Sequence, residues 1–427
     1  MIKLSFSLVI CFMINQVVLS QNNYELLYLN GDFDQILSAA EKRSTVEDCY
    51  WYSFILNKQG KTLEAIEILE EELFKFKENK SLELLISNFY YEAGSLLKAK
   101  PYLEKYQENP EIFMQLIKTF EFENNNKLAI ELLDKKIAID SMNIQYLTHL
   151  GDNYYQIDSF GLALVYYDKI LTLNPNDQLT ANKLANLYFK IKNYEKSIEI
   201  CDLVLINDST NKKFIKTKGI SSFNKKDFKT AETCLNYIYN NGDSSKFILK
   251  HLGISEFNNY LFVTSRKHLL MAYELDTNDY ETCYFLGKGF LNSPTPERGL
   301  YFFDKVDSLI QPDPLVLSAL YIEKQSIYST LNKHNEAVDC YKMGYKYNSK
   351  PEYLFFIASK YQYDLNDKEQ ALDYYEKFLD KLPPKPESDH KLEEGQMTIS
   401  LRSAAESHIS KLKEELFFEG KLKKNSP

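Results

Sequence analysis

The chain has 427 residues, of which 44% are hydrophobic, so it can bury a substantial core. The formal net charge of −9 argues against binding of nucleic acid or other phosphates as the main function of the chain. An acidic chain can nevertheless carry a local basic stripe. Five cysteines follow residue 20, without a CxxC pair or a Cys/His cluster, which excludes a disulfide scaffold and gives no zinc pattern.

Residues 1–20 are typical of a secretory signal peptide. Lys3 supplies the positive start and an apolar stretch follows it, with a cleavage position expected between Ser20 and Gln21. The apolar run is short for a bilayer span. We therefore expect an exported protein, periplasmic or extracellular and associated with the cell envelope. Cleavage of this segment and its retention as an anchor both stay open.

A period of 34 residues runs through the rest of the chain. Frames starting at residues 110, 144, 178, 212, 246 and 280 follow without a gap, and shifted frames start at 46, 80, 318 and 352. The twentieth position of every frame is small, which indicates two helices crossing closely there. These residues are Ala65, Ala99, Ala129, Ala163, Ser197, Ala231, Ser265, Gly299, Ala337 and Ala371.

The frame at 144–177 carries the most complete pattern. Leu150-Gly151 occupies its seventh and eighth positions, Ala163 its twentieth, Tyr167 its twenty-fourth and Pro175 its thirty-second. This resembles the tetratricopeptide repeat (TPR), in which each copy is a pair of antiparallel helices. The resemblance implies an all-α, right-handed α-solenoid of about ten to eleven TPR hairpins with a C-terminal capping helix.

The predicted organisation has three parts: the signal peptide, a TPR superhelix over 21–385, and a Pro-rich linker, capping helix and basic tail over 386–427. The capping helix is expected from about Glu394 to Phe418, with one apolar side that covers the last repeat. Residues 314–317 separate the last two frames from the others. The repeats lie near 24–45, 46–79, 80–109, 110–143, 144–177, 178–211, 212–245, 246–279, 280–313, 318–351 and 352–385.

The sequence shows no catalytic or cofactor-binding pattern. The segment Gly287-Lys-Gly289 lacks the third glycine of a phosphate-binding loop and falls within a predicted helix. The histidines are scattered without ligand spacing, and the cysteines fall mostly at packing positions of the repeats. We expect no enzyme activity, no cofactor and no metal.

In the TPR family, ligand contacts come mainly from the first helix of each repeat. By that resemblance, the candidate groove residues lie at the fifth, ninth and twelfth positions of several frames. An asparagine pair beside lysines is similar to the clamp with which some members hold a peptide carboxylate, but the arginine and the second-repeat asparagine of that clamp have no clear counterparts. The candidates are Asp152, Tyr155, Asn182, Asn186, Phe189, Lys216, Phe223, Lys250, Phe257 and Lys288.

The resulting hypothesis is a non-enzymatic scaffold of the cell envelope that binds a peptide or helix of a partner protein in a concave groove. One alternative is a glycan or other non-protein ligand on the aromatic row of that groove, and another is an enzyme with an unrecognised site. Neither nucleic acid nor a transmembrane segment in the mature chain is expected. The partner's identity, the biological process and the oligomeric state cannot be read from the sequence.

Overall fold

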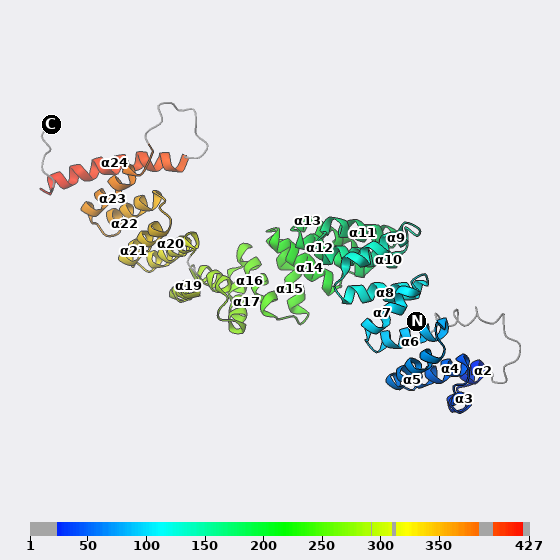
Figure 1. The fold of residues 1–427 in the computed structure, drawn as a ribbon. Coiled ribbons are helices and arrows are strands. Elements are labelled where there is room, and N and C mark those ends of the chain that lie inside the picture. Colours follow the sequence, from blue (N-terminus) through cyan, green and yellow to red (C-terminus); the bar gives the residue numbers. More distant parts are fainter. Residues whose placement is uncertain (1–23, 292, 310–312, 384–395, 422–427) are drawn as a thin grey trace. The chain divides into compact units, whose positions relative to one another are not determined.

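The computed structural model describes residues 24–291, 293–309, 313–383 and 396–421 (Figure 1). Over this part of the chain it contains 23 helices and no strand. The predicted signal peptide lies outside the described residues. No described helix is both long enough and apolar enough to cross a membrane. The chain divides into two compact units, residues 1–180 and 181–427, and the predicted all-α solenoid is confirmed.

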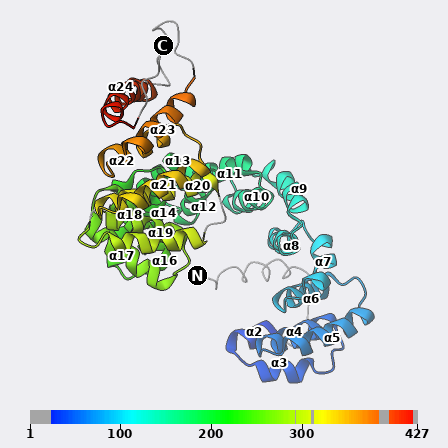
Figure 2. The same ribbon diagram turned by 90° about the vertical axis from the view of Figure 1, so that its left-hand side faces the viewer.

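The first unit is a succession of antiparallel helix pairs that follow one another from α2 to α11 (Figure 2). Each pair leaves one apolar side that the next pair covers, which is why stacked repeats are stable where a single one is not. Its helices are α2 (Tyr24–Asn30), α3 (Phe33–Ala40), α4 (Val46–Lys58), α5 (Thr62–Lys75), α6 (Lys80–Glu92), α7 (Leu96–Lys105), α8 (Pro110–Phe122), α9 (Asn126–Ile137), α10 (Ile144–Gln156) and α11 (Phe160–Leu173).

The second unit repeats the same plan and ends in one long helix. The boundary between the units falls in the first turn of α12. The helices are α12 (Gln178–Lys190), α13 (Tyr194–Asn207), α14 (Lys212–Asn224), α15 (Phe228–Asn240), α16 (Lys246–Asn258), α17 (Phe262–Leu275), α18 (Tyr280–Leu291), α19 (Glu297–Leu309), α20 (Pro314–Thr330), α21 (His334–Tyr347), α22 (Glu352–Tyr363), α23 (Lys368–Asp380) and α24 (Gln396–Phe418).

The small residues at the twentieth position are buried in all ten frames. In four frames the eighth position of the same repeat is glycine, which makes room for a larger residue at the twenty-fourth position. A Cβ added to Gly151 would lie 2.6 Å from a ring carbon of Tyr167, and one added to Gly287 would lie 2.4 Å from a ring carbon of Phe303. Small and large side chains thus alternate across the crossing and fix the register of each helix pair.

The turn between the two helices has one recurring backbone feature. The fifteenth residue of nine frames lies in the left-handed region, which reverses the chain after the first helix. Glycine fills it in two frames, and Asn, Asp, Lys or Tyr in the others. These residues are Gly60, Gly94, Asn124, Asp158, Lys192, Lys226, Tyr260, Asn332 and Asn366.

The frame at 280–313 is the exception to this turn. Its fifteenth residue is Pro294, whose ring holds φ at about −65° and so excludes the left-handed region. The helices α18 and α19 of this frame are joined by five residues, rather than the three between α16 and α17. The proline therefore replaces the usual tight reversal by a longer turn.

An Asn or Asp just before a first helix often caps it. The side chain of Asn143 accepts hydrogen bonds from the amides of Gln145 and Tyr146, and Asp279 does the same for Glu281 and Thr282. These bonds satisfy amides that have no partner within the helix. The last residue of one repeat therefore caps the first helix of the next repeat.

Two details concern the C-terminal part. Residues 314–317, expected to separate two frames, instead form the first turn of α20, because Asp313 caps that helix. The predicted capping helix is α24, which packs against α23 and α22 (Figure 1). Its apolar side enters the cluster around Phe355 and Tyr375 through Leu401, Ala405, Ile409, Leu412 and Leu416.

Candidate partner-binding surface

The predicted groove residues of the second unit lie on α12, α14, α16 and α18, the first helices of four consecutive repeats. The aromatic residue at the twelfth position packs against another aromatic residue that opens the second helix. In the second unit the ring centroids of Phe189 and Tyr194 are 5.6 Å apart, and those of Phe223 and Phe228 are 5.8 Å apart. These rings close the end of each hairpin, in the manner of a hydrophobic staple.

The same aromatic residues also contact the next repeat. Phe223 lies edge-on to His251 at 4.7 Å, and Phe257 lies edge-on to Phe285 at 5.3 Å. Phe223 and Phe257 thus pack against residues of their own repeat and of the next one. Its members are half-buried, so ring edges and parts of ring faces are committed to neighbouring side chains.

Each of the three predicted groove lysines is ion-paired, either with an acidic residue near the end of its own repeat, with one in the following repeat, or with both. The Nζ of Lys216 lies 3.0 Å from Asp243, and that of Lys288 lies 3.2 Å from Glu323. Lys250 contacts Asp279 at 2.9 Å and Glu281 at 2.7 Å. Burial opposes the charge of Lys250, but bonds to these two carboxylates raise its pKa above the usual value. Lys250 and Lys288 therefore link adjacent repeats, and all three lysines leave little uncompensated positive charge for a peptide carboxylate.

Asn182 and Asn186 are the polar residues of the predicted set that lie closest together on one helix. They lie one turn apart on α12, with Asn182 half-buried and Asn186 exposed. Side-chain amides in this spacing offer both donors and acceptors to an extended backbone.

The two candidates in the first unit, Asp152 and Tyr155, are both engaged in packing. Asp152 accepts a hydrogen bond of 2.7 Å from the hydroxyl of buried Tyr167, and Tyr155 packs on Phe160 with 5.7 Å between ring centroids. Burial, followed by this bond to Asp152, raises the pKa of Tyr167. Asp152 thus orients the large residue that Gly151 admits.

Other reactive groups of the described chain also serve packing. His268 and Glu256 form a buried pair with 2.8 Å between Nδ1 and Oε2. The five described cysteines are unbridged, and burial raises the pKa of the Cys201 thiol to about 12. Over the described residues, no group of three or more His, Cys, Asp or Glu side chains is placed to hold a metal ion.

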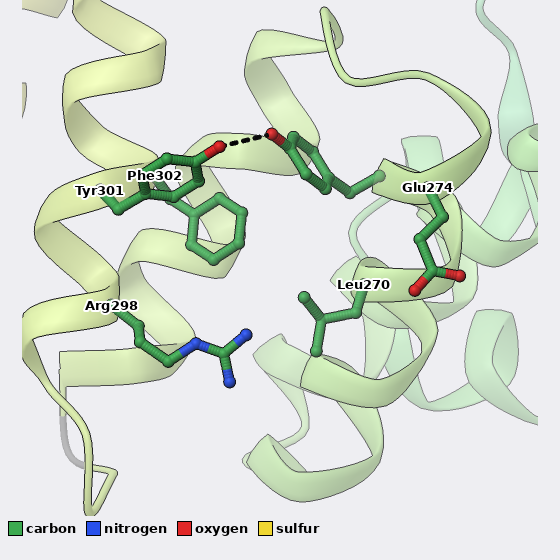
Figure 3. Close-up of a pocket in the computed structure, with 6 residues that line it drawn as sticks. Leu270, Glu274, Arg298, Tyr301 and Phe302 are labelled. Atoms are coloured by element: carbon green, nitrogen blue, oxygen red, sulfur yellow. Dashed lines mark hydrogen bonds between the residues drawn. The ribbon is translucent and has the colours of Figure 1, made fainter.

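A cavity of about 360 Å³ lies outside the predicted set, between the second helices α17 and α19 (Figure 3). The candidate residues predicted from the sequence all lie on first helices, so this cavity was not predicted. The one available signal was the proline pair Pro294 and Pro296 in the lengthened α18–α19 turn. The lining residues are Leu270, Tyr273, Glu274, Arg298, Tyr301 and Phe302.

Comparison with known families agrees with this geometry. Residues 144–177 match the sequence model of the tetratricopeptide repeat. The same hairpin, with a buried small residue at the crossing, recurs in all ten frames. The chain is a tetratricopeptide repeat protein. Repeats of this kind build surfaces for protein–protein interaction.

Individual relatives of this TPR protein match only parts of it. The "Uncharacterized protein ycf37" of Pyropia yezoensis is 31% identical over 102 residues, which are 22% of this chain and 55% of that protein. The chain thus spans about half the length of this curated relative.

Two solved structures are similar in fold. One is a tetratricopeptide repeat protein from Parabacteroides merdae, with 16% identity and a TM-score of 0.40, covering 60% of this chain and 98% of that one. The other is YrrB, described as "a TPR protein with an unusual peptide-binding site", with 18% identity and a TM-score of 0.39, covering 44% of this chain and 94% of that one. At these values the similarities carry no information about a ligand.

Proposed function

We propose that this TPR protein is a non-enzymatic scaffold of the cell envelope whose first-helix surface binds a peptide or helix of a partner protein. Within the second unit, the surface comprises the exposed side of α12, α14, α16 and α18. The observation that supports it most is the combination of accessible Asn182 and Asn186 with a charge-balanced row of lysines and half-buried aromatic rings.

This chemistry favours a particular kind of ligand. Because Lys216, Lys250 and Lys288 already have acidic partners, the surface attracts a strongly acidic peptide only weakly. Amide groups and aromatic edges instead favour an extended or helical segment held by backbone hydrogen bonds and apolar contacts.

Site-specific photo-crosslinking in the native envelope tests the proposal. A photoreactive residue at Asn186 should give a discrete crosslinked partner, whereas the same residue at Leu203, exposed on second helix α13, should not. The partner should be lost when Asn182 and Asn186 are both replaced by alanine, with thermal unfolding as the check on folding. Equal capture from both positions, or capture that survives the double replacement, would refute the proposal.

A glycan on the aromatic row has less support. Sugar stacking needs accessible ring faces, and Phe223 and Phe257 are packed against residues of their own and the next repeat. A glycan array probed with the full chain tests this alternative directly.

The envelope location rests on residues 1–20. We expect the isolated protein to begin at Gln21 and to fractionate with the envelope or the exterior. Intact Met1 in the cytoplasmic fraction would contradict export while leaving the partner-binding proposal in place.

A further inference from the structure

The cavity between α17 and α19 belongs to the second helices, and so does not depend on the first-helix surface proposed above. Leu270 and Phe302 form its apolar floor, and Phe302 is 3% exposed. The side chains of Arg298 and Leu270 extend toward each other across it, while Glu274 lies beyond Leu270 on the α17 side (Figure 3). The cavity is thus an apolar depression with charged groups at its rim.

Two arginines approach the same ring at this place, and among the described residues only Arg266 is held by a hydrogen bond. Arg266 donates a hydrogen bond of 2.8 Å to the carbonyl of Gly289, and its guanidinium carbon lies 5.7 Å from the centroid of Phe290. Arg298 lies 4.6 Å from the same centroid and is exposed. The chain has only four arginines against a large excess of lysines, so their pairing here is a distinctive local feature.

The charged groups of the cavity contrast with those of the first-helix surface. Within the described chain, neither Arg298 nor Glu274 has an ion-pair partner, whereas every predicted groove lysine has one. A guanidinium held against an aromatic ring is partly pre-organised and matches a carboxylate in a bidentate geometry.

Two phenols complete the rim. The hydroxyls of Tyr273 and Tyr301 are 3.1 Å apart, and this bond, followed by burial, raises the pKa of Tyr273 to about 12. The phenol of Tyr273 is therefore neutral at physiological pH and can act as a hydrogen-bond donor. Tyr301 is 58% exposed, which leaves its ring available to a ligand.

We propose that this cavity is a second docking site, which takes one apolar side chain of a partner protein segment flanked by an acidic residue for Arg298 and a basic residue for Glu274. The charge complementarity specifies the flanks, and the Leu270–Phe302 floor specifies the centre. Tyrosine and arginine around a small apolar depression are the residue types that dominate binding energy at protein interfaces.

The open rim favours a protein segment over a free small molecule. Three of the six lining residues, Glu274, Arg298 and Tyr301, are exposed. Sites for small ligands enclose most of the ligand surface, whereas a side chain projecting from a partner needs only a shallow depression.

Peptide binding to the full chain tests the proposal. The probes are short acetylated and amidated peptides with a central leucine flanked by aspartate and lysine, by two aspartates, by two lysines or by two glutamines, at spacings from adjacent positions to one helical turn. The unchanged protein should prefer an aspartate–lysine peptide by about fivefold in Kd over the glutamine peptide, and replacing the central leucine by alanine should abolish the preference.

Two single substitutions should switch the selected charge. Glu274→Arg leaves two cations at the rim and should select the two-aspartate peptides, while Arg298→Glu leaves two carboxylates and should select the two-lysine peptides. Lys267 is exposed on α17 and lies outside the cavity. Lys267→Glu changes the net charge by the same amount as Arg298→Glu and should leave the preference of the unchanged protein intact.

Each remaining result counts against the site. Absence of any preference among the peptides, or preferences that Lys267→Glu shifts as much as Arg298→Glu, would overturn the proposal. Binding of free aspartate and lysine, or of the peptides with alanine at the centre, would also overturn it. Replacing Asn182 and Asn186 tests only the first-helix surface, so failure of one site is distinguishable from failure of the other.

Discussion

Two adjacent repeats of the second unit, 246–279 and 280–313, share their helix crossing and differ in almost everything around it. Both have glycine at the eighth position, Gly253 and Gly287, and both have a buried small residue at the twentieth, Ser265 and Gly299. The crossing therefore constrains the sequence because backbones approach there.

The pair of core residues next to the crossing is polar in repeat 246–279 and aromatic in repeat 280–313. Glu256 and His268 form a buried hydrogen-bonded pair, while the corresponding Phe290 and Phe302 stack at 5.7 Å with an interplanar angle of 12°. The same helix geometry accepts either solution, provided that both partners are of one kind.

The outer surfaces differ accordingly. Tyr239 of the preceding repeat packs on His268 at 4.8 Å, and its hydroxyl lies 3.9 Å from the sulfur of Met271. One repeat later, Tyr273 packs on Phe302 at 5.3 Å, and the residue corresponding to Met271 is Lys305. The cavity lies at this second contact, between α17 and α19. A shared helix crossing therefore leaves the outer surface of the second helices free to acquire a binding site.

The largest effect is expected from breaking the polar pair. His268→Leu leaves the carboxylate of Glu256 buried without its partner and should lower the free energy of unfolding by about 3–5 kcal/mol. Replacing both residues by phenylalanine transplants the pair of the next repeat and should recover most of the loss. Urea unfolding with hydrogen exchange across α16 and α17 measures both variants. If the double variant is less stable than the single one, the two core solutions are not interchangeable.

A smaller loss of unfolding free energy is expected at the helix crossing of repeat 280–313. A Cβ at position 299 would lie 2.9 Å from the backbone carbonyl oxygen of Gly287, so Gly299→Ala should cost about 1–3 kcal/mol. Ser265→Ala is the matched control, since it removes only the 2.8 Å bond to the carbonyl of Gly253 and should cost about 1 kcal/mol. Equal unfolding midpoints for the two variants would show that the α18–α19 crossing can relax.

A substitution in the turn between the two helices of repeat 246–279 should instead raise the stability of the protein. Tyr260 has φ of 63° and its side chain is 81% exposed, so Tyr260→Gly should stabilise the protein by about 0.5–1 kcal/mol through relief of the left-handed conformation. Pro294 holds the same frame position in the next repeat, without a positive φ. Pro294→Gly relieves no such strain and gives the unfolded chain more freedom, so it should lower the unfolding temperature. Thermal unfolding compares the two variants, and stabilisation by both would show that the left-handed backbone is not the source of the effect.

Much of the fold was predictable because its determinants recur at fixed spacing. The buried small residues at the twentieth position predicted the crossing in every frame, and the one-sided apolar pattern of residues 401–416 predicted the cap. The left-handed fifteenth position was harder to recognise, because Lys192, Lys226 and Tyr260 occupy it beside the expected glycines. Repetition of the helix pair imposes that conformation over local preference.

The candidate surface was harder to predict than the fold. The twelfth-position aromatics were interpreted as groove residues, but an aromatic at the seventeenth position, such as Tyr194 or Phe228, already indicated a packing partner. The partners of the lysines lie far along the chain, Asp243 for Lys216 and Glu323 for Lys288, so these pairs depend on how the helices pack. The cavity depends on side-chain lengths on two different helices and on one lengthened turn, none of which is periodic.

The smallest effect concerns pH and again separates the two repeats. His251 occupies the sixth position of its repeat, between the rings of Phe223 and Phe247, where its neighbour has Phe285. Burial lowers its pKa despite the hydrogen bond to the carbonyl of Phe247, which raises it. The charge of Lys250 adds to the lowering, and the nearby carboxylates of Asp279 and Glu281 oppose it.

Because the folded pKa of His251 lies below the unfolded value of about 6.5, the folded state favours the neutral ring. Its contribution to stability is therefore complete above that pH and decreases on acidification. His251→Phe should reduce the fall in unfolding temperature between pH 7.5 and pH 5.5, while Phe285→His should increase it. Carboxylates that titrate in the same range act equally in all three proteins, so the differences between variants isolate the ring. If the slope for His251→Phe matches that of the unchanged protein, the imidazole is solvated and the first helix of this repeat is more open than its packing indicates.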